Sequence, residues 1–434
     1  MAVCNEAAAK TKGVSPMKKR NIYQNQSQEL LYLFENAGSN DKVMCVPMDY
    51  AKNDHLVMFC NGHGDILRKP FSVKNTPEGL AYIEDQVTRS CTKRGIKKEH
   101  VFFGGEDANS FAKNFVSTLR SKGFLVANVN AHDAKKQRES VQASTDRIDL
   151  MGIAAMLLNC RGNCSPAQSG IYRNLRLLVR HRRKLVQMLT EVKNRVHGIV
   201  DELFPGFLKE QNTGIVAFTE SSLYLMEDRF SPKQICRRKR KKLIEILKRF
   251  GTSKAEQTAA KLQQYAAKVL HTPVEYVDTL QLSLAQHVKH IRCLQEGVAQ
   301  LEKEIAVNLT QTQGAFLTSV RGIGIVLAAG VTAEIGNPNE QKPLNNLVSY
   351  SGIIPRVKQT GGPDGKTYTY SVARRCNRIL KDYVVKSALH MGLHGPEDLM
   401  KDYKRRDASG QHADFGIGRR YLRMAMSLMR TSQV

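Results

Sequence analysis

Several features that would assign a sequence to common classes of protein are missing from this chain of 434 residues. Tryptophan is absent, and the nine cysteines include no Cys-x-x-Cys pair, so a disulfide-rich extracellular domain is not expected. Cys160 and Cys164 are the closest pair, and without a second pair or two spaced histidines they favour reduced thiols over a zinc site. No apolar run approaches the roughly 20 residues that span a bilayer.

Signals for secretion and for nucleotide hydrolysis are missing as well. The N-terminal stretch is polar and lysine-rich, without the apolar segment of a secretory signal, so we expect a cytoplasmic protein. No Walker-type phosphate loop, histidine triad or Cys–His pair is evident. Hydrolysis of nucleotides is therefore not expected.

Acidic residues are scarce relative to basic ones. The chain has 66 lysines and arginines against 40 aspartates and glutamates, which gives a formal net charge of +26. Such an excess attracts polyanions and releases counterions when phosphates bind. Nucleic acid is therefore the expected partner, and a plain basic surface or an anionic membrane is the alternative.

The order of apolar and polar runs divides the chain into four parts. We predict a flexible basic tail over residues 1–40, in which residues 29–34 can form a helix, and an α/β catalytic domain over 41–165. A helical, basic coiled-coil region follows over 166–313, and a small helical domain over 314–434. The expected fold class is thus α/β plus all-α.

The predicted α/β domain opens with three apolar runs joined by short polar turns. These runs, residues 43–49, 55–60 and 66–73, are expected to be antiparallel neighbours in a sheet. Helices and strands then alternate, which implies parallel crossovers, over the ranges 76–94 (helix), 101–105 (strand), 108–122 (helix), 124–130 (strand) and 132–139 (start of a helix). Three strands, helix, strand, helix, strand, helix is the order of the ribonuclease-H fold.

Basic clusters and one long apolar stripe characterise the predicted middle region. The cations crowd residues 173–184 and form an unbroken run at 237–242. Leucine, isoleucine and valine recur at three- and four-residue steps between Leu280 and Ile305, which predicts a long amphipathic helix. This stripe can pack against other parts of the same chain. A dimer interface is favoured because the stripe is longer than a small domain can cover.

Four acidic residues occur where a phosphodiester-cutting site would need them. Such a site uses two divalent ions about 3.5–4 Å apart, and magnesium prefers carboxylate ligands. Asp49 ends the first predicted strand, and Glu106 ends the fourth, after two glycines expected to let the backbone turn. Asp146 and Asp149 share one face of a helix if that stretch is helical.

Each of these acids also has an ordinary interpretation. Asp49 could be a turn residue, and acids three apart often lie on a helix surface or at a cap. Asp107 would point away from Glu106, and Asp54 falls in the predicted hairpin turn, so neither is included. The joint placement of the four on the predicted topology is what favours a metal site.

With these motifs in place, the chain resembles the insertion-sequence-110 or DEDD-type transposases, also known as bridge-RNA-guided DNA recombinases. In the N-terminal half the similarity rests on Val-Pro-Met-Asp-Tyr-Ala-Lys, Phe-Phe-Gly-Gly-Glu and Ser-Thr-Asp-Arg-Ile-Asp. In the C-terminal half it rests on Leu-Thr-Ser-Val-Arg-Gly-Ile-Gly, Tyr-Ser-Gly-Ile-Ile-Pro-Arg and Ser-Val-Ala-Arg-Arg-Cys-Asn-Arg-Ile-Leu-Lys. The match covers nearly everything but the N-terminal tail.

The resemblance implies a prokaryotic, nucleoid-associated recombinase with a composite active site. The four acids would bind Mg²⁺ in a RuvC-like domain. A hydroxyl from the C-terminal domain, of another protomer in a dimer or tetramer, would attack the phosphate and form a covalent protein–DNA intermediate. A noncoding bridge RNA would pair with target and donor DNA.

Two departures from the family pattern concern the active site. The family carries a nucleophilic serine a few residues after its Gly-x-x-Pro turn, and here that position is Thr360. A threonine hydroxyl can make the same attack, although its methyl group restricts χ1. Ser371, which resembles a helix N-cap, and Ser351 are the other candidate hydroxyls. Asp-Ala-Asn follows Glu106 where the family has Thr-Gly, a change in the turn rather than in the ligand.

Further residues are candidates for contact with nucleic acid. Arg321, Gly322 and Gly324 resemble the turn of a helix-hairpin-helix motif, in which backbone amides approach a phosphate, although a plain helix connection has the same pattern. The other candidates are basic residues around Thr360 and in the segment after it, namely Arg356, Lys358, Lys366, Arg374 and Arg375. Any of these can equally be a solvated surface charge.

Three functions follow from these observations. The first is a magnesium-dependent, RNA-guided DNA recombinase. The second is a structure-specific endonuclease of the Holliday-junction type that uses the acids and water only. The third is a nucleic-acid-binding protein without catalysis.

Overall fold

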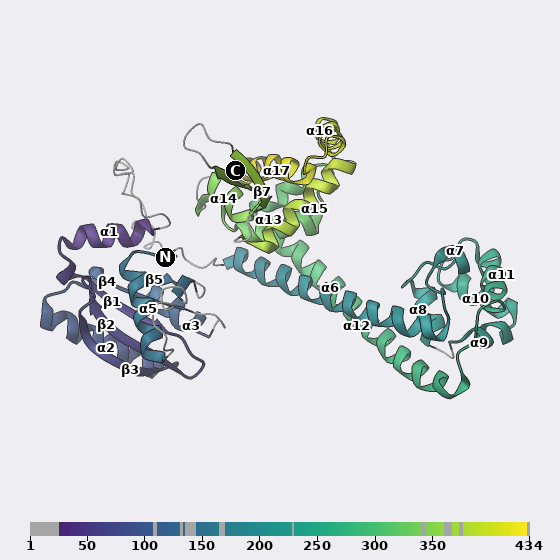
Figure 1. The fold of residues 1–434 in the computed structure, drawn as a ribbon, viewed down its shortest axis with the longest axis horizontal. Coiled ribbons are helices and arrows are strands. Elements are labelled where there is room, and N and C mark those ends of the chain that lie inside the picture. The colour runs from purple at the N-terminus through teal and green to yellow at the C-terminus, as the bar shows by residue number, and fades with distance from the viewer. Residues whose placement is uncertain are drawn as a thin grey trace, which may run out of the picture. The chain divides into compact units, whose positions relative to one another are not determined.

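The computed structural model describes residues 26–106, 111–130, 133–134, 145–164, 170–227, 230–340, 344–359, 367–372 and 376–431 (Figure 1). The chain separates into two compact units, Met1–Pro166 and Ala167–Val434. Each unit contains two clusters of buried apolar residues.

A five-stranded mixed sheet forms the centre of the N-terminal unit. Its strands are β1 (Met44–Asp49), β2 (Asp54–Asn61), β3 (Ile66–Lys74), β4 (Val101–Glu106) and β5 (Leu125–Asn128). The spatial order is β3-β2-β1-β4-β5, in which β1, β2 and β3 are antiparallel neighbours and β1, β4 and β5 are parallel. The predicted ribonuclease-H order is confirmed. Asp54, predicted in a turn, is instead the first residue of β2.

Four α-helices of the N-terminal unit are described, besides the 3-10 helices η1 (Asn40–Lys42) and η2 (Lys98–His100). The four α-helices are α1 (Gln28–Ala37), α2 (Pro77–Arg94), α3 (Lys113–Ser121) and α5 (Asp146–Leu158). The start of α2 was readable from the sequence because the Thr76 side chain accepts a hydrogen bond from the Gly79 amide and proline follows it. The helix considered at residues 29–34 of the predicted tail is present as α1, and Leu30 is fully buried there, so this part of the tail is ordered. Most of the helix predicted over 132–139 lies outside the described residues.

The two faces of the sheet are covered by different helices. Met44 and Val46 of β1 pack in one core with residues of α2 and α3. Cys45, between them, packs on the other face in a core with residues of α1 and α5. Successive residues of a strand point to opposite faces, so the side chain of every strand residue can be assigned to one of these two layers.

Two glycines near the end of β4 are required by close packing, not by a turn. Both lie in extended strand paired with β1, opposite Pro47 and Met48. A Cβ atom at Gly104 would lie 2.4 Å from a methyl carbon of Leu157 on α5, and one at Gly105 would lie 2.1 Å from the Met48 carbonyl oxygen. The prediction that they let the backbone turn is therefore wrong, and they instead let β1 and α5 approach β4.

Gly105→Ala is expected to destabilise the N-terminal unit by about 3 kcal/mol, because the added methyl overlaps a backbone oxygen that cannot move without breaking the sheet. Hydrogen exchange of the β1 and β4 amides measures the loss of protection. Gly198→Ala is the matched control, because a Cβ there meets nothing within 4 Å and alanine favours the helix. Unchanged protection of β1 in Gly105→Ala would show that the strands are not so close.

Two long helices run through the C-terminal unit, α6 (Gly170–Leu203) and α12 (Val274–Thr310) (Figure 1). They pack side by side and antiparallel, since Gly297 faces Leu185 and Arg182 pairs with Glu302 at 2.6 Å. A helical cluster lies between them in sequence, made of α7 (Glu210–Thr213), α8 (Glu220–Glu227), α9 (Pro232–Arg237), α10 (Arg240–Arg249) and α11 (Ala255–Ala266).

The apolar stripe of α12 is covered within the chain. Leu284, Val288 and Ile291 are fully buried in the core shared with α6 and the helical cluster, and Ile305 is buried in the core of the C-terminal helices. The long predicted helix is confirmed. The favoured dimer interface is not needed to explain the stripe, because α6 supplies the facing surface.

The remaining elements form a compact helical subdomain with one hairpin. They are η3 (Gln313–Ser319), α13 (Ile325–Ile335), η4 (Pro338–Glu340), α14 (Leu344–Ser351), β6 (Pro355–Gln359), β7 (Thr367–Val372), α15 (Arg378–His394), α16 (Glu397–Ala408) and α17 (Ala413–Thr431). The antiparallel β6–β7 hairpin was not predicted. Ser371 lies in β7 and is not the predicted N-cap, because Asn377 caps α15.

Candidate active site

Asp49 and Glu106 occupy matching positions on neighbouring strands. They are the last residues of β1 and β4, and they are register partners in the parallel pair. By the alternation of each strand, both side chains point to the face where Cys45 and Phe102 are buried. Both are half-buried. The two carboxylates therefore belong to one face and one edge of the sheet.

Helix α5 covers that face and begins with the other two acids. Thr145 caps it by accepting a hydrogen bond from the Ile148 amide, and Asp146 and Asp149 lie in its first turn. Asp146 is exposed and Asp149 is half-buried. The partial positive charge at a helix start favours negative side chains there.

The position of the first turn of α5 relative to Asp49 is a prediction. At the far end of the helix, Leu158 lies next to Gly64 in the β2–β3 turn, beside the amino end of β1, and Leu157 lies against Gly104 of β4. A 13-residue helix and a six-residue strand are both about 20 Å long. Since α5 packs on β1, we expect its start toward the edge where Asp49 and Glu106 lie.

The side chains that the structure describes do not already group three or more His, Cys, Asp or Glu residues in a metal-holding arrangement. Two of the predicted ligands are brought together by strand register, and two open the covering helix. Their donor set consists of carboxylate oxygens alone, which suits a hard divalent cation. The convergence of all four on one ion stays a prediction.

The two closest cysteines were predicted to be reduced thiols. Cys160 and Cys164 are buried and form no disulfide. Burial, with a contribution from Cys164, raises the pKa of the Cys160 thiol to about 11. Because zinc binds the thiolate, this environment disfavours a zinc site.

Several residues predicted around the nucleophile fall outside the described part of the chain. These are Thr360, Lys366, Arg374 and Arg375. Arg356 and Lys358 lie on β6, the strand that leads to Thr360. Ser351 is fully buried and donates its hydroxyl to the Val348 carbonyl at 2.7 Å, so it is not placed to attack DNA.

The turn at Arg321 joins η3 to α13. It has features both of a plain helix connection and of a turn that contacts phosphate. Gly322 has a φ of +92°, and a Cβ there would lie 3.1 Å from the His390 carbonyl oxygen, so glycine is required for packing on α15. Arg321 and Gly324 are exposed, and Gly324 is the N-cap of α13. The exposed helix start remains compatible with a phosphate contact. The element before the turn, η3, is a 3-10 helix, whereas the first element of a helix-hairpin-helix motif is an α-helix.

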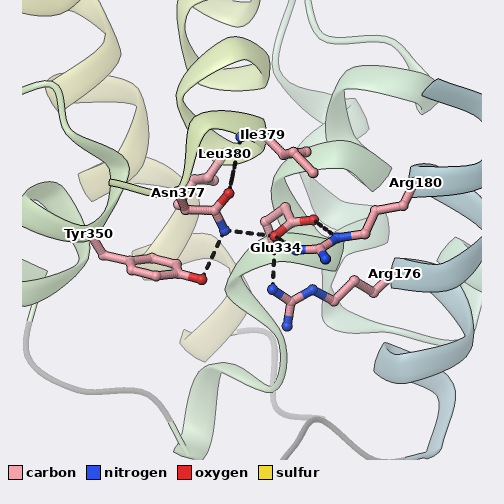
Figure 2. Close-up of polar contacts among 7 residues, drawn as sticks. All are labelled: Arg176, Arg180, Glu334, Tyr350, Asn377, Ile379 and Leu380. Carbon is pink, nitrogen blue, oxygen red and sulfur yellow. Dashed lines mark hydrogen bonds and ion pairs between the residues drawn. The ribbon is translucent and has the colours of Figure 1, made fainter. Parts of the chain in front are cut away.

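A buried carboxylate in α13 is a feature that the sequence analysis missed. Glu334 is 2% exposed and accepts hydrogen bonds from Arg180 Nε at 2.8 Å, Arg180 Nη2 at 2.9 Å and Arg176 Nη2 at 3.1 Å (Figure 2). Asn377 Nδ2 donates to it at 2.7 Å and to the Tyr350 hydroxyl at 2.9 Å. The signal in the sequence was a lone acid within the apolar helix Ile325–Ile335.

Most of the arginines crowded into α6 are engaged within the protein. Besides the two on Glu334, Arg182 pairs with Glu302 and Arg183 pairs with Asp382. This cluster therefore joins α6 to α12, α13 and α15. The run at 237–242 differs, because almost all of its side chains are exposed, at the junction of α9 and α10.

The Glu334 pairs predict a loss of stability in acid. Burial acts to raise the pKa of Glu334, but hydrogen bonds from Arg180 and Asn377 and the two arginine charges outweigh it, so the pKa lies below its usual 4.5. A lowered folded-state pKa stabilises the fold above about pH 4.5 and ceases to do so as pH falls through the folded value. Thermal unfolding of the C-terminal unit should therefore shift downward between roughly pH 5 and pH 3.

Glu334→Gln should weaken this pH dependence and lower stability near neutral pH by about 2 kcal/mol, because the buried carboxylate loses the charge that pairs with two partly exposed arginines. Glu397→Gln, which breaks an exposed pair with Lys401, is the control and should leave both quantities unchanged. An undiminished acid shift in Glu334→Gln would assign it to other groups.

A sheet of this order, with acids at the ends of two parallel strands and on the helix that covers them, is that of the RuvC-like nucleases. Comparison with known families agrees. A DEDD transposase model of the IS110 type, described as "Transposase", matches residues 46–205, and the model "Transposase IS116/IS110/IS902 family" matches residues 314–403. Together they cover more than half of the chain, and the chain belongs to the IS110 family of transposases. Membership in a DEDD family implies a nuclease-like site that depends on a divalent metal.

One curated relative is similar over part of its length. It is the "Insertion element IS110 uncharacterized 43.6 kDa protein" of Streptomyces coelicolor, 24% identical over 191 residues. The match spans 43% of this chain and 46% of that protein, so it extends over about half of each.

Within the described residues, no helix combines the length and apolar character needed to cross a membrane.

Proposed function

We propose that this protein cuts and rejoins DNA as a transposase, with a magnesium site formed by Asp49, Glu106, Asp146 and Asp149. The observation that carries the proposal is the register pairing of Asp49 with Glu106 on the sheet face covered by α5. The four carboxylates would hold two Mg²⁺ ions, which would supply positive charge to stabilise the transition state of phosphoryl transfer. Three of the four side chains are half-buried, which would limit their motion.

The attacking group in this proposal is the hydroxyl of Thr360. In sequence it lies between Gln359, the last residue of β6, and Thr367, the first residue of β7. The Thr360 oxygen would form a bond to phosphorus as the DNA phosphorus–oxygen bond breaks, leaving a covalent protein–DNA ester. A DNA hydroxyl then reverses the step and rejoins the strands. Basic residues on β6 and after β7 would neutralise the phosphates nearby.

The partners in the proposal are DNA, a noncoding bridge RNA and further copies of the chain. The net charge of +26 supports binding to nucleic acid. The RNA would select target and donor by base pairing, so that protein side chains need to contact mainly backbone. The hydroxyl would act on DNA bound by the acids of another protomer in a homodimer or homotetramer, in the prokaryotic cytoplasm near the nucleoid.

A nicked suicide substrate tests the proposal directly. The full-length protein is purified with its RNA, which is sequenced and compared with the DNA flanking the gene. A duplex of that flanking DNA is then nicked near the junction, so that cleavage releases a short strand and traps the covalent adduct. We expect an adduct that requires Mg²⁺ and is prevented by a chelator.

The alternatives give different products in the same assay. Cleavage without an adduct would indicate a water-dependent endonuclease. DNA or RNA binding with neither cleavage nor adduct would indicate a non-catalytic protein. RNA without any match to the flanking DNA would contradict guidance by a bridge RNA.

A further inference from the structure

The two ends of the β6–β7 hairpin are tied together by Tyr350 and Asn377. Tyr350 is the penultimate residue of α14, just before β6, and Asn377 follows β7 and caps α15. The Asn377 backbone amide donates to the Tyr350 carbonyl at 2.8 Å, and its side-chain amide donates to the Tyr350 hydroxyl at 2.9 Å. The chain that leaves for the hairpin and the chain that returns are thus fixed to each other.

Asn377 also fixes the hairpin to the start of the next helix. Its Oδ1 atom accepts from the Ile379 amide at 3.0 Å and from the Leu380 amide at 3.1 Å, while its Nδ2 atom donates to Glu334 and Tyr350 (Figure 2). The amide side chain therefore has one defined orientation. Any shift of its position breaks several hydrogen bonds at once.

Glu334 binds Asn377 and is itself bound by two arginines of α6. Arg180 binds both carboxylate oxygens, and Arg176 shares one oxygen with Asn377. The carboxylate is therefore bound by three side chains from elements far apart in sequence. A buried ion pair contributes little to net stability compared with apolar residues of the same volume, so its value here lies in fixing one geometry.

We propose that Glu334 is a positioning residue, which together with Asn377 and Tyr350 clamps the base of the β6–β7 hairpin and so restrains a nucleophile carried between the two strands. The proposal rests on the proposed function, because it takes Thr360, which follows β6 in sequence, as that nucleophile. Glu334 itself does not touch DNA or the reacting atoms. A shift of the nucleophile by about 1 Å is enough to slow the attack by up to about a hundredfold.

Tyr350→Phe is the most selective test of the clamp. The Tyr350 ring is 46% exposed, so loss of its hydroxyl removes one hydrogen bond to Asn377 without opening a cavity. Tyr276→Phe on α12 is the matched control, because that ring is also exposed and makes no polar contact among the described residues. Glu334→Gln removes the charge that holds both arginines while keeping the size of the side chain.

Two measurements separate positioning from folding. Hydrogen exchange of the β6 and β7 amides reports the rigidity of the hairpin, with α15 and α17 amides as the reference for the fold. Adduct formation on the nicked substrate gives a rate at saturating DNA and a half-saturating DNA concentration. We expect faster hairpin exchange, unchanged core exchange and a rate reduced about tenfold in Tyr350→Phe, with half-saturation within about twofold of the wild type.

Equal hairpin exchange and adduct rates in Tyr350→Phe, Glu334→Gln and Tyr276→Phe would overturn the clamp and leave Glu334 a structural ion pair. If the α15 and α17 amides exchange faster in Glu334→Gln, the fold of that variant is disturbed. Tyr350→Phe alone then tests the clamp. If Thr360→Ala still forms the adduct, the proposed nucleophile fails. Hairpin exchange then decides the clamp separately, because it does not depend on which hydroxyl attacks.

Discussion

Asp49→Asn and Glu106→Gln are each expected to reduce DNA cleavage on the order of 10³-fold, while the protein remains folded and bound to DNA. Each change keeps the shape of the side chain and removes the negative charge that would hold a divalent ion at the end of β1 or β4. Because the two residues are register partners, loss of either should disturb the same ion. The rate of strand cleavage at saturating Mg²⁺ on the nicked substrate measures the effect.

Asp54→Asn provides the matched control for this prediction. Asp54 is an exposed acid of the same sheet, at the start of β2 rather than at the end of a parallel strand. Its substitution should leave cleavage unchanged. Comparable losses in Asp54→Asn and Asp49→Asn would mean that general electrostatics, not metal binding, carries the effect. Full activity in both Asp49→Asn and Glu106→Gln would remove the acid site from the mechanism.

Local signals predicted the N-terminal unit well. The three opening strands alternate with short polar turns, and Thr76-Pro77 at the start of α2 is a local capping signal with a known geometry. Alternation of strands and helices then leaves few sheet orders, and the observed order is the expected one. The meeting of Asp49 with Glu106 follows from that order alone.

The predictions that failed depended on contacts between distant segments. Gly104 and Gly105 appeared to mark a turn, whereas their role is set by Met48 and Leu157, which no local pattern reveals. The β6–β7 hairpin contains the alternating Thr-Tyr-Thr-Tyr run at 367–370, which favours a strand. The domain over 314–434 was predicted to be helical, so this strand was missed.

The sequence also did not show which basic residues are paired with carboxylates inside the protein. The cations at 173–184 form a basic cluster in the sequence, yet Arg176 and Arg180 are bound to Glu334 and Arg183 to Asp382. The net charge of +26 already subtracts these carboxylates, but the cluster offers fewer cations to a phosphate than its sequence suggests. The partners were hidden because Glu334 lies about 150 residues further along the chain and inside an apolar helix.

The second large effect is expected at Thr360. Thr360→Ala should reduce the covalent protein–DNA adduct by roughly 10⁴-fold or more, since the attacking oxygen is removed. Thr360→Ser should stay within about tenfold of the wild type, because the hydroxyl remains and only the methyl group that restricts χ1 is lost. Mass spectrometry of the trapped adduct after proteolysis identifies the linked residue.

Ser371→Ala separates the two hydroxyls that the sequence offers near the hairpin. Ser371 lies within β7, on the strand that returns from Thr360, so removing its hydroxyl preserves both the strand and the general environment. The adduct should form at the wild-type rate in this variant. An adduct lost in Ser371→Ala but retained in Thr360→Ala would move the nucleophile from the segment between the strands to β7. The acids would then face a hydroxyl whose position is set directly by strand pairing, and the clamp at Tyr350 and Asn377 would lie only a few residues from it.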